Sequence, residues 1–276
     1  MVTARALGLL LSDPQRSQAA LAGLGAHLGL PSMTDGAGIA SSVDGGTLLT
    51  RRPGLPPMMT LSGLVGTLKG RTAVVQLRLP TDVRPTSESP HHLGPFRLKG
   101  IACAVVGGPQ DADHAGALRE RLIASLPDFL RRSVLGQSEG EAFFFAVLAS
   151  LQTRGLLERT PSAEQIALAV REGIAQTDGL PRYVVIANGS SLVVVSQGIP
   201  GGFVTMSGID EEVASGLEPT LADSSLARER LRRFRGIVTV GALDEPLPSS
   251  HGSTFRFTNL AETCAVEFGR DFESRH

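Results

Sequence analysis

Two parts of the sequence carry side chains that could bind or transform a small molecule. The first centres on Arg78, a charged residue in the apolar run Ala73–Leu79, which we predict to be a strand. A buried guanidinium without a partner is too unfavourable to persist, so Arg78 needs an anion or a carboxylate beside it. Two interpretations are open: a clamp for the carboxylate of a ligand, and an ion pair within the core.

The second part is the turn Gly136–Glu141, which precedes a predicted helix over Ala142–Leu151. Ser138 and Glu141 have the spacing of a capping box. Glu139 lies in the expected first turn of the helix, where the helix dipole favours an acid whatever else the residue does. Ligand binding and helix stabilisation are therefore both open for Glu139.

The sequence indicates no metal centre. His91 and His92 are adjacent, so in an extended segment they would point to opposite sides, and no cluster of Cys, Asp or Glu completes a site around them. Cys103 and Cys264 are too few for a disulfide framework and lie in strand-like runs, where a small buried thiol is the ordinary interpretation. We expect neither a metal nor any other cofactor.

Composition excludes several classes of partner. The 276 residues are 42% hydrophobic, which is ample for a core, and 26 Lys and Arg nearly balance 27 Asp and Glu. No overall positive field recruits nucleic acid or an anionic membrane, and no run of about 18 apolar residues could form a membrane helix. We expect a cytoplasmic protein that forms a single domain over residues 1–276, because no linker interrupts the pattern.

The predicted strands and helices that must position these side chains follow one another in an order that indicates the class of fold. Hairpin turns are predicted at Asp44-Gly45-Gly46 and Asn188-Gly189, near the two ends of the chain. Most helices, including Asp113–Leu126 and Ser162–Gln176, lie between them. The strand Ile101–Val106 ends in Gly107-Gly108, which we expect to be a turn. This order predicts an α+β fold with helices packed on antiparallel sheets, and argues against a doubly wound parallel sheet.

Seven short motifs together resemble the class II glutamine amidotransferases, and in particular the single-domain branch that includes the γ-glutamyl hydrolases of ergothioneine biosynthesis. Along the chain they are Thr3-Ala4-Arg5-Ala6-Leu7-Gly8, Asp35-Gly36-Ala37-Gly38-Ile39-Ala40, Gln76-Leu77-Arg78-Leu79-Pro80-Thr81, Gly94-Pro95-Phe96, Val106-Gly107-Gly108, Gly136 to Glu141, and Asp244-Glu245-Pro246-Leu247. These families are N-terminal-nucleophile hydrolases. The resemblance spans nearly the whole chain and implies a four-layer αββα sandwich with two mostly antiparallel sheets between helical layers.

The same resemblance implies that the residues of the reaction have been lost. In the family an N-terminal cysteine attacks the amide carbon while its own α-amino group serves as the base. The matching residue here is Ala4, which has no nucleophile. An asparagine that helps to hold the oxyanion is matched by Gly107, with Gly108 after it, so only backbone remains there.

Part of the substrate site is retained in the sequence. The resemblance makes Arg78, Thr81 and Glu139 the candidate substrate-binding residues. Arg78 would take the α-carboxylate of a glutamyl substrate. Glu139 stands where the family has an aspartate for the α-amino group, and its longer side chain could do the same.

These departures predict a catalytically degenerate protein that acts as a binding, scaffolding or regulatory subunit beside another chain, such as a synthase. Two alternatives remain. One is an active amidotransferase or γ-glutamyl amide hydrolase with an unorthodox N-terminal nucleophile, for example Thr3 after removal of Met1 and Val2. The other is a sensor that binds glutamine or glutamate through Arg78 and Glu139 without chemistry.

One further cluster stands apart from these motifs: the arginines at 228, 230, 232, 233 and 235, interrupted by Glu229. We interpret it as a solvated helix face, with a surface for an acidic partner as the alternative.

Overall fold

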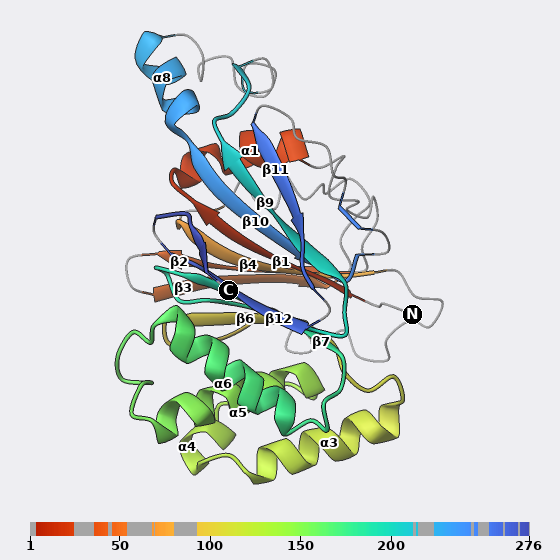
Figure 1. Cartoon of the computed structure of the whole chain (residues 1–276). Coiled ribbons are helices and arrows are strands. Elements are labelled where there is room, and N and C mark those ends of the chain that lie inside the picture. Colours follow the sequence, from red (N-terminus) through yellow and green to blue (C-terminus); the bar gives the residue numbers. More distant parts are fainter. Residues whose placement is uncertain are drawn as a thin grey trace.

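A computed structural model of the chain describes residues 4–24, 36–43, 46–53, 68, 70–79, 93–211, 214, 224–243, 246–247, 254–261, 263–269 and 271–275. Within these residues two antiparallel sheets stack face to face, and helices cover their outer faces (Figure 1). The α+β class and the two sheets between helical layers, expected from the sequence, are confirmed.

The first sheet contains the N-terminal strand at its centre. Its order is β11 (Phe255–Asn259), β9 (Gly201–Ser207), β10 (Arg235–Gly241), β1 (Ala4–Leu11), β4 (Thr72–Arg78), β2 (Gly36–Val43) and β3 (Gly46–Pro53). The second sheet has the order β13 (Ser274–Arg275), β12 (Thr263–Phe268), β8 (Leu192–Gln197), β7 (Arg182–Ala187), β6 (Ile101–Gly107) and β5 (Phe96–Leu98).

The helices are divided between the two outer faces. Below the second sheet in Figure 1 lie α3 (Ala112–Ala124), α4 (Asp128–Arg131), α5 (Glu139–Thr153) and α6 (Ala163–Ala175). The short 3-10 turn η1 (Pro14–Arg16) leads into α1 (Ser17–Leu24), which packs on the first sheet. Helix α8 (Ser225–Arg233) stands at the top of the view, beyond the end of that sheet.

Strand β1 shows why the sequence forms three hydrophobic layers. Successive strand residues point to opposite faces. Leu7, Leu9 and Leu11 enter the core between the first sheet and α1, whereas Ala6 and Leu10 enter the core between the two sheets. Because both faces are covered, the strand is continuously apolar from Ala6 to Leu11, as expected for a strand buried on both sides. A third core joins the second sheet to α3, α4, α5 and α6.

Local turn chemistry agrees with the sequence at one site and differs at another. The turn at Asn188-Gly189 joins β7 to β8, and the Asn188 side chain accepts bonds from the backbone N–H groups of Ser190 and Ser191. The capping box predicted at Ser138 and Glu141 is wrong. The Ser138 side chain makes no capping bond, because Glu141 turns back to accept from the backbone of the preceding loop, from Gly136 N at 2.6 Å and Leu135 N at 3.2 Å.

Candidate functional site

A cavity of about 660 Å³ opens where the two sheets meet the first turns of α3 and α5. Its volume lies within the range of small-molecule sites. Its lining consists of Ala4, Gln76, Phe96, Val105, Val106, Gly107, Gly108, Pro109, Gln110, His114, Ala115, Ser138, Glu139, Gly140, Leu180, Pro181 and Ile199. Four residues selected from the sequence, Ala4, Gly107, Gly108 and Glu139, thus share one cavity although they come from three distant segments.

Strand register explains this convergence. Ala4 begins β1 and is paired with Arg78, the last residue of β4. Gly107 ends β6 and is paired with Arg182, the first residue of β7. The sheets stack closely enough that a β-carbon on Gly8 would lie 2.7 Å from Val185 and Leu192 of the second sheet. The open end of β1 therefore lies beside the turn that follows β6.

The turn at Gly107-Gly108 packs against Pro181, which directly precedes β7, and against Ile199, which lies between β8 and β9. Gly107 has φ +96°, and a β-carbon there would lie 2.3 Å from the carbonyl oxygen of Pro181 and 2.4 Å from Cδ1 of Ile199. The Gly108 N–H donates to that same Pro181 oxygen at 3.0 Å. There is therefore no space for a side chain at residue 107. The backbone N–H of Gly108 already has an acceptor in the Pro181 carbonyl oxygen.

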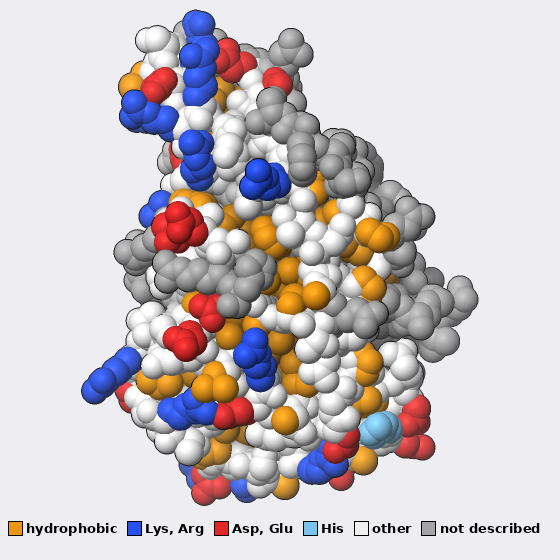
Figure 2. Space-filling model, viewed as in Figure 1, with side chains coloured by type: hydrophobic (Ala, Val, Ile, Leu, Met, Phe, Trp, Pro, Cys, Tyr) orange, Lys and Arg blue, Asp and Glu red, His pale blue; other side chains and the backbone are white. Residues whose placement is uncertain are grey.

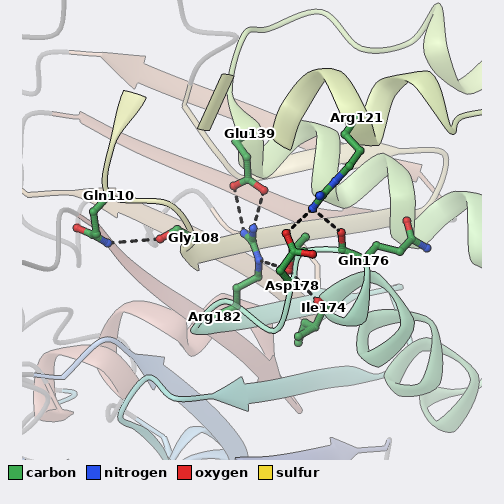
Figure 3. Close-up of polar contacts among 9 residues, drawn as sticks. Gly108, Gln110, Arg121, Glu139, Ile174, Gln176, Asp178 and Arg182 are labelled. Carbon is green, nitrogen blue, oxygen red and sulfur yellow. Dashed lines mark hydrogen bonds and ion pairs between the residues drawn. The ribbon is translucent and has the colours of Figure 1, made fainter. Parts of the chain in front are cut away.

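The carboxylate of Glu139 forms a two-point ion pair with Arg182 (Figure 3). Nη2 to Oε1 is 2.6 Å and Nη1 to Oε2 is 3.1 Å. The Arg182 side chain is fully buried, and that of Glu139 is 10% exposed. Two further contacts hold the guanidinium: Nε donates to Thr177 Oγ1 at 3.3 Å, and the group lies 4.6 Å from the ring centroid of Phe143.

Sequence reasoning missed Arg182, although one signal was present. Arg182 directly precedes the apolar run Tyr183–Ala187, which the sequence predicts to be a strand. A charged residue at the head of such a run needs a partner for the same reason as Arg78. Nothing in the local sequence identifies that partner, because Glu139 lies 43 residues earlier.

The other substrate-binding candidates lie differently from Glu139. Arg78 is half-buried at the end of β4, opposite Ala4 and Gly36, so the expectation of a guanidinium deep in the core does not hold for it. The described residues that line the cavity do not include Arg78. Thr81 lies outside the described residues, so its role stays a prediction.

Several polar side chains in the lining were not proposed as site residues from the sequence. Gln76 of β4 donates from Nε2 to the Val105 oxygen at 3.1 Å, which ties the two sheets together at the cavity wall. Gln110 donates to the Gly108 oxygen at 3.5 Å (Figure 3). Ser138 and His114 complete the set. Among the described lining residues Glu139 is the single carboxylate, so its pairing with Arg182 leaves the cavity wall without an unbalanced acid.

Neither a metal centre nor a membrane helix is found in the part of the chain that the structure describes. These residues contain no group of three or more His, Cys, Asp or Glu side chains placed to hold a metal ion, and no helix among them is long and apolar enough to span a membrane. Cys103 is buried in β6, where burial raises the pKa of its thiol.

No protein-family model and no curated protein matches the chain, but solved structures with a similar fold exist. A glutamine aminotransferase class-II domain protein from Silicibacter pomeroyi is 12% identical, with a TM-score of 0.55 and 98% of each chain covered. A predicted glutamine amidotransferase from Pseudomonas aeruginosa is 15% identical, with a TM-score of 0.52, covering 99% of this chain and 95% of that one. For the glutamine phosphoribosylpyrophosphate amidotransferase of B. subtilis the identity is 14%, the TM-score 0.51 and the coverage 98% of this chain and 48% of that one.

The chain therefore has the fold of the class II glutamine amidotransferase-like proteins, an N-terminal-nucleophile-hydrolase-like architecture, as the resemblance of its motifs predicted. The assignment to the branch of ergothioneine-pathway hydrolases stays a prediction.

Proposed function

We propose that this glutamine amidotransferase-like protein is catalytically degenerate and acts as a binding, scaffolding or regulatory subunit beside another protein chain. The observation that carries the proposal is the position of Ala4. It lies in the wall of the cavity, together with the glycine turn and Glu139, where the resemblance requires the attacking cysteine. A methyl group there offers no nucleophile.

The glycine turn supports the proposal independently. An oxyanion is stabilised by donors aimed at it, and loss of one donor in amide-cleaving enzymes lowers the rate by about 10²–10³. Here Gly107 has no side chain, and Pro181 and Ile199 fill the space that one would need. The Gly108 N–H already donates to Pro181. The side-chain donor implied by the resemblance is thus missing, and the backbone N–H of the next residue is engaged.

The ion pair of Glu139 bears on the sensor alternative. In the family the matching carboxylate receives the α-amino group of the substrate. In this chain a guanidinium from β7 takes the equivalent role, bonding both oxygens of Glu139. A ligand ammonium would have to share the carboxylate with Arg182, which is fully buried, already neutralises its charge and is also held by Thr177. We therefore favour a protein-binding role over recognition of free glutamine or glutamate.

Assays of amide hydrolysis test the proposal directly. The purified full-length protein should release no ammonia from glutamine or from γ-glutamyl amides above the buffer blank, and mass spectrometry should define its N-terminus in the same sample. Ser138→Ala and His114→Ala are the matched variants, because these side chains are a possible nucleophile and base in the lining. Hydrolysis that either substitution abolishes, or that tracks with exposure of Thr3, would overturn the proposal.

Calorimetry separates the subunit from the sensor. Titration of the protein with glutamine and with glutamate should give no heat of binding. Binding to either amino acid that disappears in Arg78→Ala would support the sensor alternative instead.

A further inference from the structure

Helix α8 projects from the body of the protein with little support. It extends beyond the first sheet at the top of the molecule in Figure 1, and Leu231 is its buried residue. The following Phe234 is also buried and anchors the helix end. A helix of this length is marginal in water without packing contacts. Its exposed faces are therefore available to a partner.

The outward face of α8 combines one apolar side chain with two arginines. At 3.6 residues per turn, Leu226, Arg230 and Arg233 fall on one stripe, at positions i, i+4 and i+7. This stripe lies on the side of the helix opposite the buried Leu231. Leu226 is 64% exposed, more than other large apolar side chains among the described residues except Leu135. The Arg233 side chain is 80% exposed and pairs with Glu229 at 2.6 Å.

The charges on α8 are unbalanced. The helix contains four arginines and one glutamate. Figure 2 shows Lys and Arg side chains gathered over this projection. Arg228 and Arg232 are a like-charged i, i+4 pair, which destabilises an isolated helix. Arg232 reaches Glu211 at 3.4 Å, whereas no acid among the described residues pairs with Arg228 or Arg230. Carboxylates from a partner would relieve this repulsion.

We propose that α8 is a docking helix for an acidic protein surface, one that presents carboxylates to Arg230 and Arg233 around an apolar recess for Leu226. Helices dock in grooves through residues spaced in this way. A polynucleotide backbone would meet the arginines but would leave Leu226 without an apolar contact. Glu229, which lies beside them, would be repelled by the phosphates of a polynucleotide or of an anionic lipid surface, whereas a protein surface can avoid it. The inference rests on the proposed subunit role and names the surface through which it operates.

A labelled helical peptide with glutamates surrounding a leucine stripe serves as the probe, measured by fluorescence anisotropy against the full-length protein. A DNA duplex and vesicles containing phosphatidylserine are the competing arms. We expect the peptide to bind more tightly than either of these, and Arg230→Glu with Arg233→Glu to weaken it by about tenfold or more, since charges around a docking site govern recognition. Leu226→Ala, which changes no charge, should weaken it by at least about threefold.

The matched control is Arg132→Glu with Arg159→Glu, which makes the same change in net charge at exposed sites in the helical layer on the other side of the molecule. It should leave peptide binding within about twofold of the unmodified protein, because exposed charges more than a Debye length away are screened. Equal loss in the control, no effect of Leu226→Ala, or tighter binding of DNA or vesicles would overturn the docking surface.

The outcome is separable from that of the hydrolysis assay. Failure of the peptide to bind a protein that releases no ammonia overturns the docking helix and leaves the catalytic degeneracy. Ammonia release by a protein whose α8 binds the peptide overturns the catalytic degeneracy and leaves the docking helix.

Discussion

Arg182 and Glu139 bond at two points, 2.6 Å and 3.1 Å long, across the end of the cavity. The pair joins the first residue of β7 to the first residue of α5, so it fixes the second sheet against its helical layer. It also sets the electrostatics of the cavity, because Glu139 is the single carboxylate in the described lining and its charge is balanced by Arg182, which is not a lining residue. A β-carbon on Gly108 would lie 3.0 Å from Glu139 Oε2, so the glycine turn rests directly on the pair.

Breaking this pair should be costly. Arg182→Met leaves the nine-tenths buried Glu139 without its cation, and we expect a loss of about 3–5 kcal/mol in the free energy of unfolding. Glu139→Gln should act in the same direction, and the double variant should lose less than the sum of the two. Urea unfolding measures all three.

Asp178→Asn is the control for an exposed ion pair. Its partner Arg121 lies 2.7 Å away, but both side chains are more than half exposed (Figure 3), so the loss should be about 0–1 kcal/mol. Additive single losses would contradict the coupling.

Substitution of Gly107 should be limited by space as well as by backbone conformation. Gly107→Ala forces a contact with the Pro181 carbonyl and Ile199, and we expect a loss of about 2–4 kcal/mol in unfolding free energy. Gly155→Ala isolates the conformational part, because Gly155 has φ +68° with no atom within 4 Å; it should cost about 1–2 kcal/mol. Gly116→Ala, in open space within α3, should stabilise by about 0.5–1 kcal/mol. A loss at Gly107 no larger than at Gly155 would argue against the steric account.

Restoring the nucleophile alone should not restore hydrolysis. A protein trimmed to begin at residue 4 and carrying Ala4→Cys would place a thiol and a free α-amine at the cavity wall. We expect ammonia release from glutamine to stay at the blank, because the Gly108 N–H is engaged by Pro181 and residue 107 provides no side-chain donor. Alkylation of the new thiol by iodoacetamide is the control for its accessibility. Turnover by an alkylation-sensitive enzyme would show that the glycine turn rearranges.

The thiols of the buried Cys103 and the half-buried Cys264 should make stability fall at alkaline pH. Burial raises the pKa of Cys103 and of Cys264, so both stay protonated in the folded chain where an unfolded thiol ionises, at about pH 8.5. Because the unfolded state then binds fewer protons, the stabilisation is fully present below about pH 8.5 and declines above it. Urea unfolding at increasing pH should show this decline, and Cys103→Ala should reduce its slope. Equal slopes in the two proteins, or rapid reaction of Cys103 with a thiol reagent in the native state, would contradict it.

Elements set by neighbouring residues were predictable. The hairpin at Asn188-Gly189, the apolar strand β1 and the amphipathic α6 follow from turn chemistry and periodicity. A capping box that the sequence suggested at Ser138 forms instead at Ser162 and Gln165, at the start of α6. Such motifs compete with other hydrogen bonds. After Ser138, the Glu141 carboxylate accepts from the backbone N–H groups of Leu135 and Gly136 and not from the N-cap residue.

By itself the sequence determined the class of fold and the absence of a nucleophile at residue 4, because the order of strands and helices and the identity of a side chain need no coordinates. Only the tertiary structure decided that Arg182 is buried, that it meets Glu139 and that the Gly108 N–H donates to Pro181. Those contacts depend on distances between atoms of segments far apart along the chain, and such distances exist only once the sheets have stacked and the helices have packed against them.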